Sequence, residues 1–156
     1  MSRFDEAQER DMILFVGSYL PTQKKAVAKL SRMLERELTA CVILDDSDMS
    51  ARVGLPLNHQ AIVLECDFSK EIEIQKALLA YKSRFLAVTC RAEKNIPLLK
   101  KVVPHVPYLN TPTEKSLDWT TDKIKMRQLL RGYDRSIAPK FVVAHDASKE
   151  TLDRIE

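Results

Sequence analysis

Short apolar runs alternate with segments of helical periodicity along most of the chain. Five runs predict strands, the first three of them buried: MILFVGSY (12–19), ACVILDD (40–46), QAIVLECDF (60–68), FLAVTC (85–90) and PYLN (107–110). Helical spacing of apolar residues marks KKAVAKLSRMLERE (24–37), SKEIEIQKALLAYKSR (69–84), AEKNIPLLKKVVPHV (92–106) and a segment from Thr120 to Gly132, with Gly132 as a left-handed C-cap. KFVVAH (140–145) predicts one more strand and SKETLDRIE (148–156) one more helix.

This alternation predicts an α/β fold, a Rossmann-like open and mostly parallel sheet with helices on both faces. In such sheets ligands lie beyond the carboxyl ends of the strands. The residues at those ends are Gly17-Ser18-Tyr19, Asp45-Asp46, Asp67 and Cys90-Arg91-Ala92-Glu93.

The residues at these strand ends do not match the common sequence motifs for nucleotide binding, phosphorylation or nucleophilic catalysis. The turn GSYLPTQKK after the first strand has one glycine where the dinucleotide fingerprint needs three, and no P-loop motif occurs. Asp67 suits a phosphorylated receiver domain, but Gly17-Ser18 stands where that domain needs an acidic pair. No nucleophile elbow surrounds Ser18, so its hydroxyl is left to contact a ligand or to cap the next helix.

Composition and charge argue against several classes of protein. Of the 156 residues, 45% are hydrophobic and 30% charged, and the net charge of +3 is spread among interspersed acids and bases, too mild to predict a nucleic-acid partner. The three cysteines and three histidines are scattered without metal-ligand spacing, which favours reduced core thiols and no metal site. The polar N-terminus has no signal-peptide core, and no apolar stretch reaches the length of a membrane span. We expect a cytoplasmic protein without a membrane partner.

The segment TTDKIKMRQLL (120–130) carries a less usual pattern. Asp122 and Lys123 stand near a helix start, where Thr120 or Thr121 is placed to cap the free amides. A lysine there pairs poorly with the positive helix end, whereas an anionic phosphate would suit both the lysine and the helix terminus. Arg127 follows one turn later on the same face. The pattern indicates a phosphate contact at Lys123.

The stretch AVTCRAEKNIPLLKKVV, followed by YLNTPTEKSLDWTTDKIKMRQLL and then IAPKFVV, resembles a linear signature of the ATP-grasp enzymes. Glu93 matches the turn glutamate of that signature, Asp122-Lys123 the opening of its helix, and Pro139 the entry to the first strand of the ATP domain. Family members often have a small glycine-containing turn before the fifth strand, and this chain has PHVPYLN instead.

The resemblance implies an ATP- and Mg²⁺-dependent ligase that activates a carboxylate as an acyl phosphate for attack by an amine or related nucleophile. It implies that Lys123 contacts the ATP phosphates and that this domain lines the substrate pocket. The implied pocket residues are Gly17, Ser18, Tyr19, Arg91 and Glu93. No catalytic or metal-binding residue is assigned to this part of the enzyme.

The resemblance also implies the division of the chain. We expect a flexible N-terminal segment (1–11), a pre-ATP-grasp Rossmann-like domain (12–110), and a linker helix with the start of a truncated ATP-grasp domain (111–156). The expected partners are the remaining ATP-grasp subdomains and a small-molecule carboxylate or amine, with a homodimer left open, and the fragment alone is expected to be inactive. The alternative is a stand-alone α/β module that binds a small ligand or regulates a protein.

Overall fold

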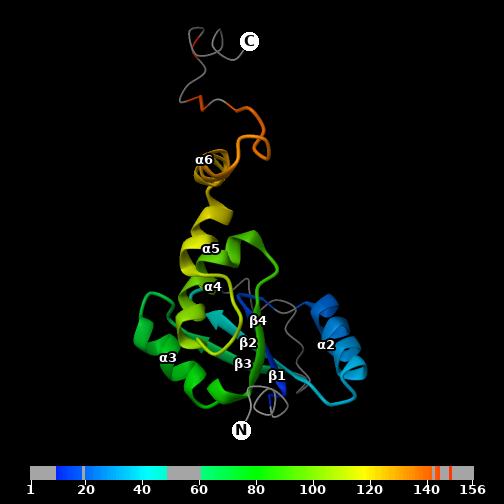
Figure 1. The fold of residues 1–156 in the computed structure, drawn as a ribbon. Coiled ribbons are helices and arrows are strands. Elements are labelled where there is room, and N and C mark those ends of the chain that lie inside the picture. The colour runs from blue at the N-terminus through cyan, green and yellow to red at the C-terminus, as the bar shows by residue number, and fades with distance from the viewer. Residues whose placement is uncertain (1–9, 19, 49–60, 142, 145–147, 149–156) are drawn as a thin grey trace. The chain divides into compact units, whose positions relative to one another are not determined.

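The computed structural model describes residues 10–18, 20–48, 61–141, 143, 144 and 148 (Figure 1). The chain forms two compact units, Met1–Leu117 and Asp118–Glu156.

The described part of the first unit contains a four-stranded parallel sheet. Its strands are β1 (Met12–Val16), β2 (Thr39–Asp45), β3 (Ala61–Cys66) and β4 (Phe85–Thr89), in the spatial order β3-β2-β1-β4. All five residues of β1 are buried, as expected for a central strand covered on both faces. The predicted α/β, Rossmann-like fold is confirmed.

Helices cover both faces of this sheet (Figure 1). The helices of the first unit are α2 (Pro21–Met33), α3 (Glu71–Leu79), α4 (Ile96–Val102) and the first part of α5 (Glu114–Thr121), with short 3-10 turns η2 (Lys82–Arg84), η3 (Glu93–Asn95) and η4 (Val103–His105). Val27 of α2 packs on one face with Ile13, Phe15 and Val42. On the other face, α3, α4 and Leu117 of α5 pack on the alternate residues of the same strands.

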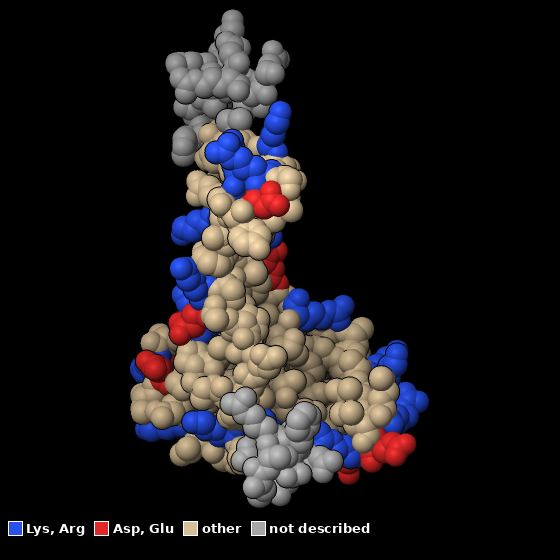
Figure 2. Space-filling model, in the orientation of Figure 1, with Lys and Arg blue, Asp and Glu red and all other residues tan. Residues whose placement is uncertain are grey.

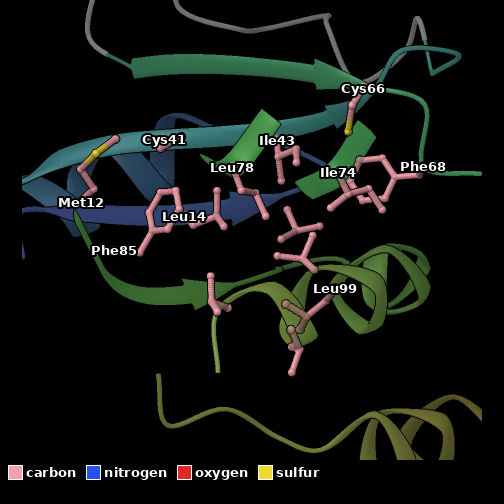
Figure 3. Close-up of a cluster of buried hydrophobic side chains, with 14 of the residues drawn as sticks. Met12, Leu14, Cys41, Ile43, Cys66, Phe68, Ile74, Leu78, Phe85 and Leu99 are labelled. Carbon is pink, nitrogen blue, oxygen red and sulfur yellow. The ribbon is translucent and has the colours of Figure 1, made fainter. Parts of the chain in front are cut away.

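The second face carries the larger apolar cluster (Figure 3). It brings Met12, Leu14 and Ile43 of the strands together with Leu78 of α3 and Leu99 of α4. Full burial of one such side chain contributes about 1.5–3 kcal/mol to folding. This cluster therefore anchors the helices that follow β3 and β4, and with them the loops at the carboxyl ends of those strands.

The cysteines belong to this apolar interior. Cys41 and Cys66 are buried, Cys90 is half-buried, and all three are free thiols, as the sequence predicts. Burial raises the pKa of Cys41 to about 12, and burial together with the nearby carboxylates raises that of Cys66 to about 11.

The region after α4 departs from the prediction. Residues 107–110 form a turn, not a strand: Leu109 N donates to Val106 O at 3.0 Å, and Pro107 has no N–H to give to a sheet. Among the described residues of 140–145, no strand is present, and most of the predicted helix at 148–156 lies outside the described residues.

The second unit contains α6 (Lys123–Tyr133), and the helix predicted from Thr120 is in fact two helices that meet at Asp122. Gly132 lies inside α6 with ordinary helical backbone, so its predicted role as a left-handed C-cap is wrong; the Asp134 N–H continues the helical pattern to Leu130 O. None of the residues of α6 is buried. It carries four basic residues and no acidic one; Lys123, Lys125 and Arg131 are exposed and Arg127 is half-buried. On the first unit, acidic and basic side chains both occur on the face that Figure 2 shows.

Within the described chain, no helix combines the length and the apolarity that crossing a bilayer requires. The expected cytoplasmic location stays a prediction.

Candidate functional site

The order of strands reverses between β1 and β4. Strands β2 and β3 are added on one side of β1, and β4 then returns to its other side. The connection after β1 leads to α2 on one face, whereas the connection after β4 leads to α4 on the other face (Figure 1). Open parallel sheets bind ligands at such a switch point, beyond the carboxyl ends of the strands. We call these two connections the switch-point loops; their described residues are 17, 18, 20 and 90–95.

Gly17 begins the first switch-point loop with a backbone that favours glycine. Its φ is +79°, in the left-handed region, and its N–H donates to Ile43 O of β2 at 2.9 Å. A Cβ at this position would lie 2.5 Å from Cγ and Nδ2 of Asn95, far closer than any ordinary contact. Both the conformation and the space therefore require glycine here.

Asn95, in the second switch-point loop, covers Gly17. Its side chain is buried, with 3% of the residue exposed, and its Nδ2 donates to Val16 O at the end of β1, 3.4 Å away. Its own N–H donates to Ala92 O at 2.9 Å, which closes η3. Asn95 thus connects the loop after β4 to the last carbonyl of β1.

Arg91 makes a second connection between the loops. Its exposed guanidinium donates from Nη1 to Oγ1 of Thr22, in the first turn of α2. Arg91 precedes η3, whose last residue is Asn95, so the same short turn carries both links.

The start of α2 lacks an acidic or hydroxyl cap. Leu20 occupies the N-cap position and Pro21, which has no N–H, the first turn. The buried Gln23 takes over part of the capping: its Oε1 accepts from Leu20 N at 2.5 Å and its Nε2 donates to Ser18 O at 3.4 Å. The first turn of α2 contains no Asp or Glu.

The structure places four of the five predicted pocket residues on the switch-point loops. These are Gly17, Ser18, Arg91 and Glu93, of which Ser18 is half-buried and Glu93 is exposed at the first position of η3. Tyr19 lies outside the described residues. That these residues line a substrate pocket stays a prediction.

The acidic residues at the other strand ends serve in turns. Asp45 Oδ1 accepts hydrogen bonds from the N–H and the hydroxyl of Ser47, at 3.0 and 2.7 Å. Asp67 accepts from Ser69 N at 2.8 Å and pairs with Lys70 at 2.9 Å; hydrogen bonds from Ser69 and then from Lys70 lower its pKa to about 2. Both carboxylates are therefore engaged by their own chain.

In the second unit, Lys123 is the first residue of α6 and Asp122 is its N-cap. The Asp122 carboxylate accepts from Ile124 N and Lys125 N at 3.1 and 3.0 Å and pairs with the Lys125 ammonium at 3.2 Å. These hydrogen bonds, that of Lys125 N first, lower the pKa of Asp122. The expectation that Thr120 or Thr121 caps this helix is wrong, because both residues belong to α5 and the adjacent carboxylate reaches the amides first.

Lys123 itself is exposed, and its Nζ donates to Thr120 O at 3.4 Å. Arg127, on the next turn, lies over the ring of Phe141, with 5.9 Å between the guanidinium carbon and the ring centroid. A phosphate at this helix start would meet the lysine ammonium, while two of the first amides are already used by Asp122.

Sequence reasoning missed Asn95, Gln23 and Thr22. Gln23 had a recognisable signal, because the side chain of a Gln at the third helical position often accepts a hydrogen bond from the backbone N–H of the N-cap residue. Nothing local in the sequence indicates that Asn95 is buried, because its partners Val16 and Gly17 lie almost eighty residues away. In the described residues, no group of three His, Cys, Asp or Glu side chains is placed to hold a metal ion.

Comparison with known proteins does not identify a family for this chain. No family profile matches the chain, and no curated protein matches it. Among solved structures, a wide-type short-chain dehydrogenase/reductase from Veillonella parvula, in complex with NADP, is similar at 12% identity and a TM-score of 0.38. The match covers 66% of this chain and 45% of that protein, and a similarity of this degree carries no argument about function.

Proposed function

We propose that this chain forms the N-terminal, substrate-side domain of an ATP- and Mg²⁺-dependent ligase of the ATP-grasp type. The reaction joins a carboxylate to an amine or related nucleophile. A carboxylate oxygen attacks the γ-phosphorus of ATP and ADP leaves; the amine then attacks the carbonyl carbon of the acyl phosphate and inorganic phosphate leaves. Mg²⁺ and cationic side chains would stabilise the charge on the transferring phosphoryl group.

The order of elements supports this proposal. A Rossmann-like sheet is followed by a second unit whose helix α6 opens with Asp122-Lys123, in the arrangement that the sequence resemblance implies. The observation that carries the proposal is Lys123 at the first position of α6, an exposed cation where helix geometry alone asks for an anion.

The structure sharpens the proposed role of Lys123. Asp122 already occupies two amides of α6, so Lys123 would hold phosphate through its ammonium group and not together with the helix amides. The switch-point loops of the first unit would contact the acceptor substrate, through Ser18, Arg91 and Glu93.

A binding experiment on the complete natural protein tests this role. Calorimetry with Mg²⁺ and the non-hydrolysable analogue AMP-PNP should show that Lys123→Ala weakens binding at least about tenfold, which corresponds to about 1.4 kcal/mol. Lys125→Ala is the matched control: this lysine lies two residues away on the same helix, is paired with Asp122, and should leave the affinity within about twofold. Equal affinities in all three proteins would remove Lys123 from the nucleotide site.

The 156-residue chain gives a second test. The proposal predicts no tight nucleotide binding, so a Kd for Mg-ATP below about 1 µM, or about −8 kcal/mol, would contradict it. That result would favour the alternative of a stand-alone ligand-binding module, as would a natural stop codon near Glu156. Further coding sequence for a glycine-rich hairpin and late acidic and Asn metal ligands would favour the ligase.

A further inference from the structure

We propose that Asn95 is a positioning residue that holds the two switch-point loops in one arrangement before any ligand binds. The inference rests on the proposed function only in taking these loops as part of the acceptor-substrate pocket. The geometry that carries it lies entirely within the first unit.

The burial of Asn95 needs an explanation. Taking an amide side chain out of water is unfavourable unless its hydrogen bonds are replaced, and an apolar residue of similar size would fill the space without that cost. Asn95 is nevertheless 3% exposed, and from the loop after β4 it reaches the Val16 carbonyl at the end of the neighbouring strand β1. An apolar residue in this position could not make the hydrogen bond that connects the two loops.

Gly17 provides the complementary half of the contact. Its missing Cβ is the space that the Asn95 amide group fills, and its N–H is tied to Ile43 O on the opposite side, in β2. The start of the first loop is therefore held between β2 and Asn95. We call this arrangement the Gly17–Asn95 interlock.

The interlock also sets the place of Arg91. The Asn95 N–H closes the turn on Ala92 O, directly after Arg91, and the Arg91 guanidinium then reaches Thr22 on α2. Without the Asn95 side chain, the 92–95 turn loses its hydrogen bond to Val16 of β1. The backbone at Arg91 is then no longer held in place, and its guanidinium is no longer positioned to reach Thr22 of α2. Fixing such groups in advance reduces the entropy cost of binding a ligand.

A double-mutant cycle tests the interlock in the 156-residue chain. Gly17→Ala places a methyl group against Asn95, and Asn95→Ala removes the atoms that it meets. The urea midpoint of the double variant should therefore fall by clearly less than the sum of the two single shifts. If the two shifts add, the residues do not act as a unit and the proposal fails. Asn95→Ser, a milder change, replaces Asn95→Ala in the cycle should that variant not fold.

A spectroscopic comparison separates positioning from a merely structural role. In Asn95→Ala or Asn95→Ser, the guanidinium N–H signals of Arg91 should lose the slow exchange given by the Thr22 bond, under conditions where the protein is still folded. Thr22→Val identifies that signature, since it removes the hydroxyl that accepts the bond. Val102→Ala is the matched control, a fully buried truncation on α4, outside the loops, that should destabilise the fold.

The outcomes are decisive in each direction. Loss of the Arg91 signature in the Asn95 variants, with the signature retained in Val102→Ala, supports positioning. An unchanged signature in the Asn95 variants, or an equal loss in Val102→Ala, overturns it. Neither experiment contains nucleotide, so both can fail while the ligase proposal stands, and both can succeed if the ligase proposal is wrong.

Discussion

The two helices that begin at candidate binding regions, α2 and α6, start in opposite ways. The start of α6 is neutralised by its own chain, because Asp122 accepts from two amides of the first turn. The start of α2 has no acidic residue in its first turn, and its N-cap is Leu20, with Gln23 accepting the Leu20 N–H. A positive helix end is thus not by itself an anion site; the residues beside it decide how much of its charge remains.

The difference extends to the glycine near each helix. Gly17, before α2, has a left-handed backbone and no room for a Cβ, whereas Gly132, inside α6, has nothing within 4 Å of the place a Cβ would take. Gly17, at the start of the loop before α2, is held between Ile43 O and Asn95, whereas α6 has no buried residue.

The largest effect is expected from alanine at the two glycines. Gly17→Ala should lower the free energy of unfolding by about 2–4 kcal/mol, since the methyl group adds both backbone strain and a clash with Asn95. Gly132→Ala should leave stability unchanged or raise it by about 0.5–1 kcal/mol, because alanine favours the helix. Urea unfolding of the 156-residue chain measures both. Similar losses at both positions would contradict the contrast.

A smaller effect is expected at Gln23. Gln23→Ala leaves Leu20 N without its acceptor and should cost about 1–2 kcal/mol in urea unfolding. Gln23→Glu retains an acceptor for that N–H and places a negative charge in the first turn of α2, so it should cost less. If Gln23→Glu were the more harmful change, the bond from Nε2 to Ser18 O would be the important one.

The smallest effect concerns pH and the cap of α6. The pKa of Asp122 is lowered in the folded protein, so its contribution is fully present above the ordinary carboxyl pKa of 3.8 and is lost as pH falls through the lower folded value. The protection factors of the Ile124 and Lys125 amides, which correct for the intrinsic pH dependence of exchange, should therefore stay constant from neutral pH to about 4 and fall below it.

Asp122→Asn is the control for this titration. Asparagine also caps helices but carries no titrating group, so the acid step should disappear while protection at neutral pH is largely kept. An acid step of the same size in Asp122→Asn would assign it to another carboxylate.

The two central strands were predictable from the sequence because β1 and β2 are buried along most of their length and read as unbroken apolar runs such as 12–16. The third run was also expected to be buried, but β3 and β4 lie at the edges of the sheet and each has only one buried residue. The turn near Pro107 was harder to predict. The apolar residues at 107–110 suggested a strand, but Pro107 and the hydrogen bond from Leu109 N to Val106 O produce a turn. The sequence also identified both strand ends of the candidate site. It could not reveal the contact between Gly17 and Asn95, because that contact depends on the return of β4 to the side of β1.

The buried thiols offer a way to observe the interior directly. At neutral pH, Cys41 and Cys66 carry almost no thiolate, the form that reacts with alkylating agents, because their pKa values lie near 12 and 11. Any alkylation of Cys41 thus reports a molecule in which the apolar cluster around this thiol has opened. The rate at which this side chain is labelled therefore measures how often the interior around Cys41 opens under native conditions, without denaturant.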